Sequence, residues 1–239
     1  MTLHALLARL GVSGAQLSQA ADLGDTGATE GTGDTATALR PAPPAADPGP
    51  LRSFDPIEIG RLEAAVWAAY YRRQWLRLLL LSAALVHRAF GMDWPRTVHG
   101  SWLVLRANQL WAPYPRNDPD GARRCMRRFY ALVRLTYGEP ANPAKAAELE
   151  VDWWRVHREI QHESGRTQDE LVESLLRLYC YLYGDPEEAL RPAAVHRAQA
   201  MELSDQWVEE GCQPDSPLLP LEHAALVRAY AALLAAVHH

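Results

Sequence analysis

The segment Leu149–Gln161 reads LEVDWWRVHREIQ, and its apolar residues recur at the three- and four-residue spacing of an amphipathic helix. A carboxylate, Glu150, and an imidazole, His157, fall on the tryptophan side of that apolar stripe. Residues seven apart in a helix lie within about 20° of each other, so both polar side chains share one face. The segment therefore predicts a helix that brings polar groups to the edge of a core.

Helix boundaries on either side of this segment follow one repeated signal. An Asp or Asn stands just before a proline at several positions, which is typical of a capped helix start, and a glycine follows at the helix end. Short loops between helices favour antiparallel neighbours. The chain is therefore predicted to be all-α, with a single bundle-like domain of about seven helices, at approximately 56–90, 95–111, 119–137, 143–164, 168–183, 186–210 (bent near Pro192) and 219–237.

The N-terminal fifth has a different composition. Beyond an apolar segment at residues 2–10, residues 24–50 are rich in Gly, Thr, Ala, Pro and Asp and have almost no large apolar residue. Such a segment cannot bury enough surface to offset its ordering entropy. We therefore divide the chain into residues 1–53, a tail with one short helix and a disordered linker, and residues 54–239, the helical domain.

Charge and cysteine content limit the class of protein. The net charge is -5 over 239 residues, which does not favour a general nucleic-acid-binding surface. Three cysteines lie far apart, as expected for reduced thiols rather than a disulfide framework or a zinc site. The N-terminus lacks a secretory signal, and the most apolar run, Leu78–Val86, is much shorter than the about 20 residues that span a bilayer. These features predict a cytoplasmic protein without a membrane span.

Acidic residues recur on the inward stripes of three helices. Glu63 and Asp205 occupy apolar stripes as Glu150 and His157 do, and an unpaired buried carboxylate is costly. Inward Glu and His side chains on facing helices are how bundles build carboxylate metal centres. One hypothesis is therefore a metal-dependent oxidoreductase with iron or manganese, in a di-iron or di-manganese centre, held by Glu63, Glu150, His157 and Asp205.

The spacing of Glu150 and His157 resembles the first metal-binding helix of heme-oxygenase-like di-iron proteins. The resemblance covers this one helix only. The later helix of that family carries a carboxylate four residues after a histidine, whereas His196 here is followed by Ala200. The paired Glu-x-x-His of ferritin-like proteins is also absent.

The interpretation we favour is a buried hydrogen-bond network without a cofactor. His157 would bond to Glu150 or to a tyrosine, and Glu63 and Asp205 would pair with arginines. The chain would then be a non-catalytic binding protein that contacts a protein partner or another copy of itself. A third hypothesis is a small-molecule pocket with Glu150 or His157 at its polar end, lined by Trp67, Tyr70, Tyr71, Trp153 and Trp154.

One predicted helix is rich in arginine on a broad face. The residues are Arg123, Arg124, Arg127, Arg128 and Arg134. They favour either a surface for an anion or an acidic partner, or an ordinary solvated helix face, and the second interpretation is commoner.

Overall fold

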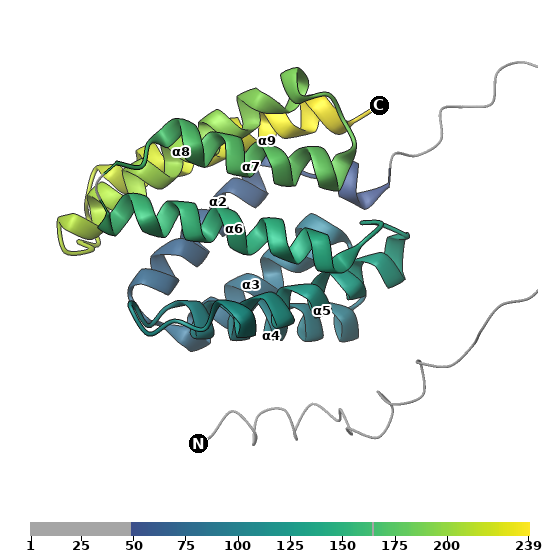
Figure 1. Cartoon of the computed structure of the whole chain (residues 1–239), viewed down its shortest axis with the longest axis horizontal. Coiled ribbons are helices and arrows are strands. Elements are labelled where there is room, and N and C mark those ends of the chain that lie inside the picture. Colours follow the sequence, from purple (N-terminus) through teal and green to yellow (C-terminus); the bar gives the residue numbers. More distant parts are fainter. Residues whose placement is uncertain (1–48, 164) are drawn as a thin grey trace, which may run out of the picture. The chain divides into compact units, whose positions relative to one another are not determined.

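The computed structural model describes residues 49–163 and 165–239, so the expectations for residues 1–48 lie outside it. The described part is all-α, as predicted. A short 3₁₀ helix, η1 (Pro50–Arg52), comes first. The helices that follow are α2 (Pro56–Tyr71), α3 (Trp75–Phe90), α4 (Trp94–Trp111), α5 (Pro119–Tyr137), α6 (Pro143–His162), α7 (Gln168–Tyr183), α8 (Glu187–Glu209) and α9 (Leu218–Val237) (Figure 1).

The predicted start signals cap the helices in the expected way. The side chains of Asp55, Asp93, Asp118 and Asn142 each accept hydrogen bonds from the first turn of α2, α4, α5 and α6. Thr167 forms a complete capping box with Glu170 at the start of α7. At α8 the signal differs, because Pro186 is the N-cap residue and no side chain caps this helix. That helix also continues through Pro192 as one element.

The predicted helix at 56–90 is two helices. Arg72 ends α2, and Arg73 has a left-handed φ of 56° before α3 begins. Neither glycine nor proline marks this break in the sequence. Contacts with residues far away in the chain stabilise it. Arg72 donates to the carbonyl of Cys212 at 3.0 Å and its guanidinium lies 5.0 Å from the centre of the Trp207 ring. Arg73 lies over the Trp75 ring. The described part therefore has eight α-helices instead of about seven.

The eight helices form a closed ring. Each helix packs beside the next one along the chain, and α9 returns to pack against α2. In Figure 1, α7, α8 and α9 lie on one side, α3, α4 and α5 on the other, and α2 and α6 between them. At the closing contact, Gly60 of α2 lies directly against Val227 of α9. The inward faces of all eight helices therefore meet around one centre.

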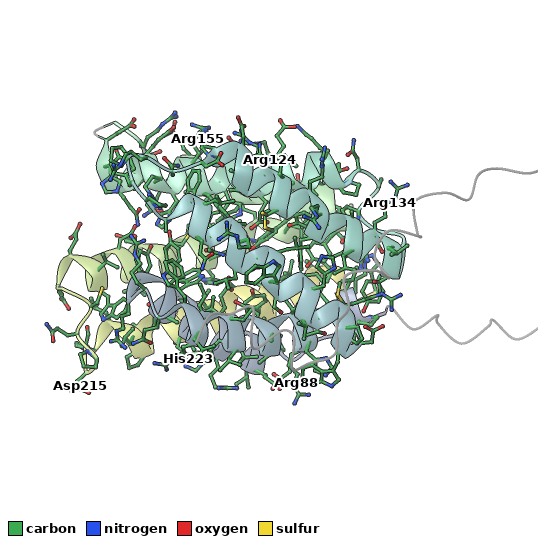
Figure 2. All side chains as sticks on the ribbon, turned by 90° about the horizontal axis from the view of Figure 1, so that it is seen from below. Arg88, Arg124, Arg134, Arg155, Asp215 and His223 are labelled. Atoms are coloured by element: carbon green, nitrogen blue, oxygen red, sulfur yellow. The ribbon has the colours of Figure 1, made fainter. Side chains whose placement is uncertain are left out.

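Side chains fill most of that centre, and charged ones cover the outside. Leu171, Leu175 and Leu190 are fully buried, whereas Arg88, Arg124 and Arg134 project from the outer surface (Figure 2). In the described residues, one helix is long and apolar enough to cross a membrane, α9, with a mean hydropathy of 1.3. A single helix of this kind does not make the described residues a multi-span membrane protein.

Candidate functional site

The first polar cluster in the ring is an ion pair between α2 and α8. Arg197 donates to both carboxylate oxygens of Glu63, and Tyr230 of α9 also donates to Glu63. The guanidinium lies between two rings, 5.7 Å from the centre of Trp67 and 5.5 Å from that of Trp153. Burial would lower the pKa of Arg197, but the Glu63 carboxylate raises it well above the usual value. Arg197 is therefore charged, and its hydrogen bonds with Glu63 and Tyr230 hold three helices together.

The second cluster surrounds Glu150 of α6. The hydroxyl of Tyr130 donates to one carboxylate oxygen at 2.7 Å, and the indole nitrogen of Trp154 donates to the other at 3.2 Å. Burial raises the pKa of Glu150, although the hydrogen bond from Tyr130 and the charge of Arg197 partly offset it. Burial also raises the pKa of Tyr130, and the Glu150 carboxylate adds to that rise. Glu150 therefore takes up a proton more readily than an exposed glutamate.

The third cluster joins α6 to α8 and α2. A ring nitrogen of His157, Nε2, lies 2.9 Å from Oδ2 of Asp205. Gln161 donates to the other oxygen of Asp205 at 2.6 Å and to the hydroxyl of Tyr71 at 3.2 Å. Burial, followed by the Asp205 charge, raises the pKa of Tyr71, so this hydroxyl stays neutral. The carboxylate thus orients an imidazole.

The four residues proposed as metal ligands are divided among these clusters. Asp205 lies beside His157, but Glu63 pairs with Arg197, and Glu150 with Tyr130 and Trp154. In residues 49–163 and 165–239, no three His, Cys, Asp or Glu side chains are grouped so that they could hold a metal ion. The donor set therefore gives an iron or manganese centre no support. Glu63 pairs with an arginine, as the network interpretation predicts. Asp205 instead pairs with a histidine, and Glu150 does not form a hydrogen bond with His157.

A cavity of about 180 Å³ lies between the three clusters. All five aromatic residues proposed as pocket lining form part of its wall, namely Trp67, Tyr70, Tyr71, Trp153 and Trp154. Three further wall residues, Glu63, Glu150 and His157, are among the ligands proposed in the metal hypothesis. The residues converge because α2 and α6 both turn their aromatic stripes towards the centre of the ring.

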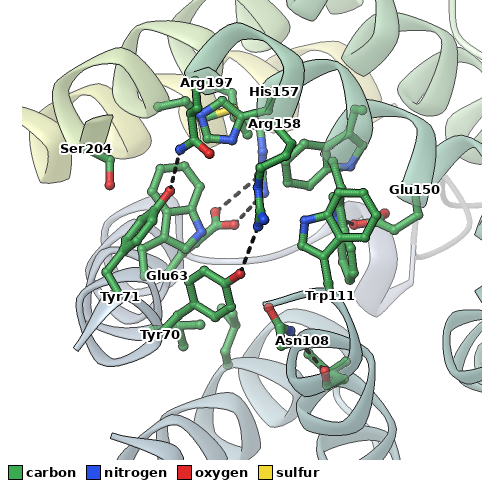
Figure 3. A pocket seen from close by; sticks show the side chains of 18 residues that line it. Glu63, Tyr70, Tyr71, Asn108, Trp111, Glu150, His157, Arg158, Arg197 and Ser204 are labelled. Atoms are coloured by element: carbon green, nitrogen blue, oxygen red, sulfur yellow. Dashed lines mark hydrogen bonds and ion pairs between the residues drawn. The ribbon is translucent and has the colours of Figure 1, made fainter. Parts of the chain in front are cut away.

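Sequence reasoning missed one charged residue of the cavity wall, Arg158, whose guanidinium has few polar partners. Its side chain projects into the cavity between Tyr70 and Trp111 (Figure 3). Its guanidinium lies 5.4 Å from the centre of the Trp111 ring and 5.6 Å from that of Tyr114. One terminal nitrogen donates to the Tyr70 hydroxyl at 3.3 Å. In the described residues, no carboxylate forms an ion pair with Arg158, and the hydrogen bond to Tyr70 uses one of its five N–H donors.

Sequence reasoning also missed four residues of the polar clusters and the cavity wall: Arg197, Tyr130, Tyr230 and Trp111. Arg197 has a sequence signal, because it lies one helical turn from Ala194 and Met201 on the inward stripe of α8. Trp111 ends a helix next to a proline-rich loop and is 7% exposed. The tyrosines belong to helices whose partners in space are set by ring closure, which no local pattern reveals.

The arginine-rich face of α5 lies on the outside of the ring. Arg123 pairs with Asp120 at 2.8 Å, and Arg124 lies 3.6 Å from Asp118. The other three, Arg127, Arg128 and Arg134, are exposed. This face is therefore solvated in the isolated chain and separate from the cavity.

No protein-family model matches this chain, and no curated protein or solved structure is significantly similar to it. A function for the cavity therefore has to be argued from its own geometry.

Proposed function

We propose that this chain binds a small molecule with a ring-sized apolar body and an anionic end in the cavity of the helical ring. The observation that carries this proposal is the position of Arg158 in the wall of an aromatic cavity, without an acidic partner in the described part of the chain. Ligand sites are typically concave and mostly apolar, with a few converging polar groups that fix orientation.

The volume of the cavity supports a ligand of that size. An apolar cavity of about 150 Å³ in another protein holds a benzene molecule. The cavity here measures about 180 Å³ and has six aromatic wall residues: Trp67, Tyr70, Tyr71, Trp111, Trp153 and Trp154. A single aromatic ring with one charged substituent therefore fits.

The charges in the wall favour an anion over a cation. Arg197 already occupies the faces of Trp67 and Trp153, where an organic cation would bind. Arg158 offers a planar set of donors that matches a carboxylate. His157, oriented by Asp205, supplies a second polar contact in the same wall.

The test is a titration of the full chain with benzoate, followed by tryptophan fluorescence. We expect saturable one-to-one binding, and at least a tenfold loss of affinity in Arg158→Gln, since a charge-assisted hydrogen bond contributes about 1.5–3 kcal/mol. The matched control is Arg155→Gln on the same helix, whose guanidinium pairs with Asp152 and Glu159 outside the cavity. Equal affinity in the two variants would contradict the proposal.

A second candidate function, binding of an acidic protein partner, is favoured by the charge distribution. Residues 94–137 contain eight arginines and two aspartates, although the whole chain has a net charge of -5. The test is a titration with poly-glutamate at low and physiological salt. Binding that Arg127→Glu combined with Arg128→Glu abolishes would support this candidate. All three cysteines are free thiols, which supports a cytoplasmic location for either function.

A further inference from the structure

A second chamber of about 240 Å³ adjoins the aromatic cavity inside the ring. Side chains from η1 and all eight α-helices form its wall, and most of them are aliphatic or phenyl groups. They include Ile59, Val86, Phe129, Leu178 and Leu233. No part of the proposed function uses this space.

The two chambers share one wall. Trp153, Trp154 and Glu150 of α6 line both, as do Glu63 and Arg197. The first chamber contains the open guanidinium of Arg158, and the second contains none of the cationic groups except Arg197, whose charge Glu63 neutralises. The first chamber therefore carries the charge that has no counter-ion in the described residues, and the second is lined mainly by apolar side chains.

Each chamber also contains a buried hydroxyl with no partner in the described residues. Ser204 lines the first chamber and Ser82 the second, and each is 1% exposed. Neither hydroxyl oxygen has a hydrogen-bond partner there. Unsatisfied buried polar groups are uncommon in native structures.

We propose that the two chambers hold one amphiphilic carboxylate, with its head at Arg158 and its hydrocarbon chain in the second chamber. This inference rests on the proposed function, because it keeps the same head-group site and adds the chemical class of the ligand. A chain of methylene groups is the occupant that matches an apolar chamber joined to a polar one.

Glu150 lines both chambers, and its two carboxyl oxygens accept hydrogen bonds from Tyr130 and Trp154. Burial raises the pKa of this carboxyl, which weakens its repulsion of an anionic ligand. A cationic amphiphile is disfavoured because Arg158 would repel its head, while the aromatic faces of Trp67 and Trp153 already hold Arg197.

The experiment is calorimetric titration of the full chain with straight-chain carboxylates from butanoate to decanoate. Burial of one methylene contributes about 0.8 kcal/mol, so we expect affinity to rise about fourfold for each added methylene until the second chamber is full. Stoichiometry should remain one to one. An alkylammonium with the same chain length should bind at least tenfold more weakly, and equal affinity for the two heads would overturn the assignment of the head to Arg158.

A variant of the second chamber separates this inference from the proposed function. Ser82→Leu places a larger side chain in the chamber and reduces its volume, so we expect it to weaken decanoate at least tenfold and to leave butanoate and benzoate unchanged. Ser82→Ala removes the hydroxyl without filling the space and should retain decanoate binding. Ala89→Leu, in the same wall, gives an independent filling variant if Ser82→Leu does not fold.

The outcomes are distinguishable. If benzoate binds but chain length has no effect, or if both filling variants bind decanoate like the original chain, the amphiphile inference is wrong and the proposed function stands. If no carboxylate of either series binds, both are wrong.

Discussion

Arg197 of α8 and Glu63 of α2 form a bidentate ion pair across the centre of the ring, with side chains that are 13% and 7% exposed. The pair connects residues 134 positions apart in the chain. Two charges that lose their water are stable only together, and removal of one leaves the other buried and unpaired. The pair therefore specifies how α2 and α8 face each other.

The first prediction concerns this pair. Arg197→Met should lower the free energy of unfolding by about 3–5 kcal/mol, because Glu63 then lacks its counter-charge. The double variant with Glu63→Gln should recover part of that loss. Urea unfolding of the two single variants and the double variant measures the coupling. A double variant no more stable than Arg197→Met would show that the pair is not the source of the effect.

The second prediction concerns Glu222 of α9, which is 1% exposed and has no hydrogen-bond partner for either carboxyl oxygen in the described residues. Burial raises its pKa from 4.5 to about 8, and the charges of Glu63 and Asp205 add to the rise. The folded state therefore holds a proton that the unfolded state releases. Its stabilising effect is complete below about pH 4.5 and is lost as the pH rises through about 8.

Glu222→Gln has nearly the same shape as the protonated glutamate, but its side chain does not titrate. We expect its stability to lie within about 1 kcal/mol of the original chain at pH 5 and to be about 4–5 kcal/mol higher at pH 9, as measured by urea unfolding across that range. Glu209→Gln, at an exposed position on α8, is the control and should show no such divergence. Parallel stability curves for the Glu222 variant and the original chain would contradict the raised pKa.

Much of the fold could be predicted because its boundaries are local. Asp55, Asp118 and Asn142 cap helices through hydrogen bonds within three residues, so the sequence next to each boundary is sufficient. The break between α2 and α3 could not be predicted in this way. It depends on Arg72, which donates a hydrogen bond to a carbonyl 140 residues away. The residue that follows, Arg73, has a left-handed backbone conformation, and no sequence pattern predicts such a conformation for arginine.

Only part of the cavity wall could be predicted from the sequence. Trp67, Tyr70 and Trp153 could be placed on inward stripes, because helical periodicity fixes their faces. Their charged partners could not be assigned, since Tyr230 meets Glu63 from 167 residues away, at the closure of the ring. Arg158 follows His157 directly, and a helical wheel does not show that its long side chain bends towards Trp111.

The third prediction concerns metal removal. Because Glu63, Glu150 and Asp205 all have protein partners, dialysis of the full chain against a chelator should leave the melting temperature unchanged. Elemental analysis before and after dialysis is the accompanying measurement. One equivalent of iron or manganese, together with a fall of several degrees after its removal, would restore the hypothesis of a metal-dependent oxidoreductase.

The fourth prediction concerns closure of the ring at Gly60. Alanine is usually better than glycine inside a helix by about 1 kcal/mol. Here a Cβ atom would lie 2.9 Å from both the backbone nitrogen and Cγ2 of Val227, so α9 would have to move away from α2. We expect Gly60→Ala to destabilise the chain by about 1–3 kcal/mol in urea unfolding. Adding Val227→Ala removes the methyl contact but not the backbone contact, and should therefore restore only part of the loss. A more stable Gly60→Ala would mean that α2 and α9 are not in close contact and that the ring is open at this point.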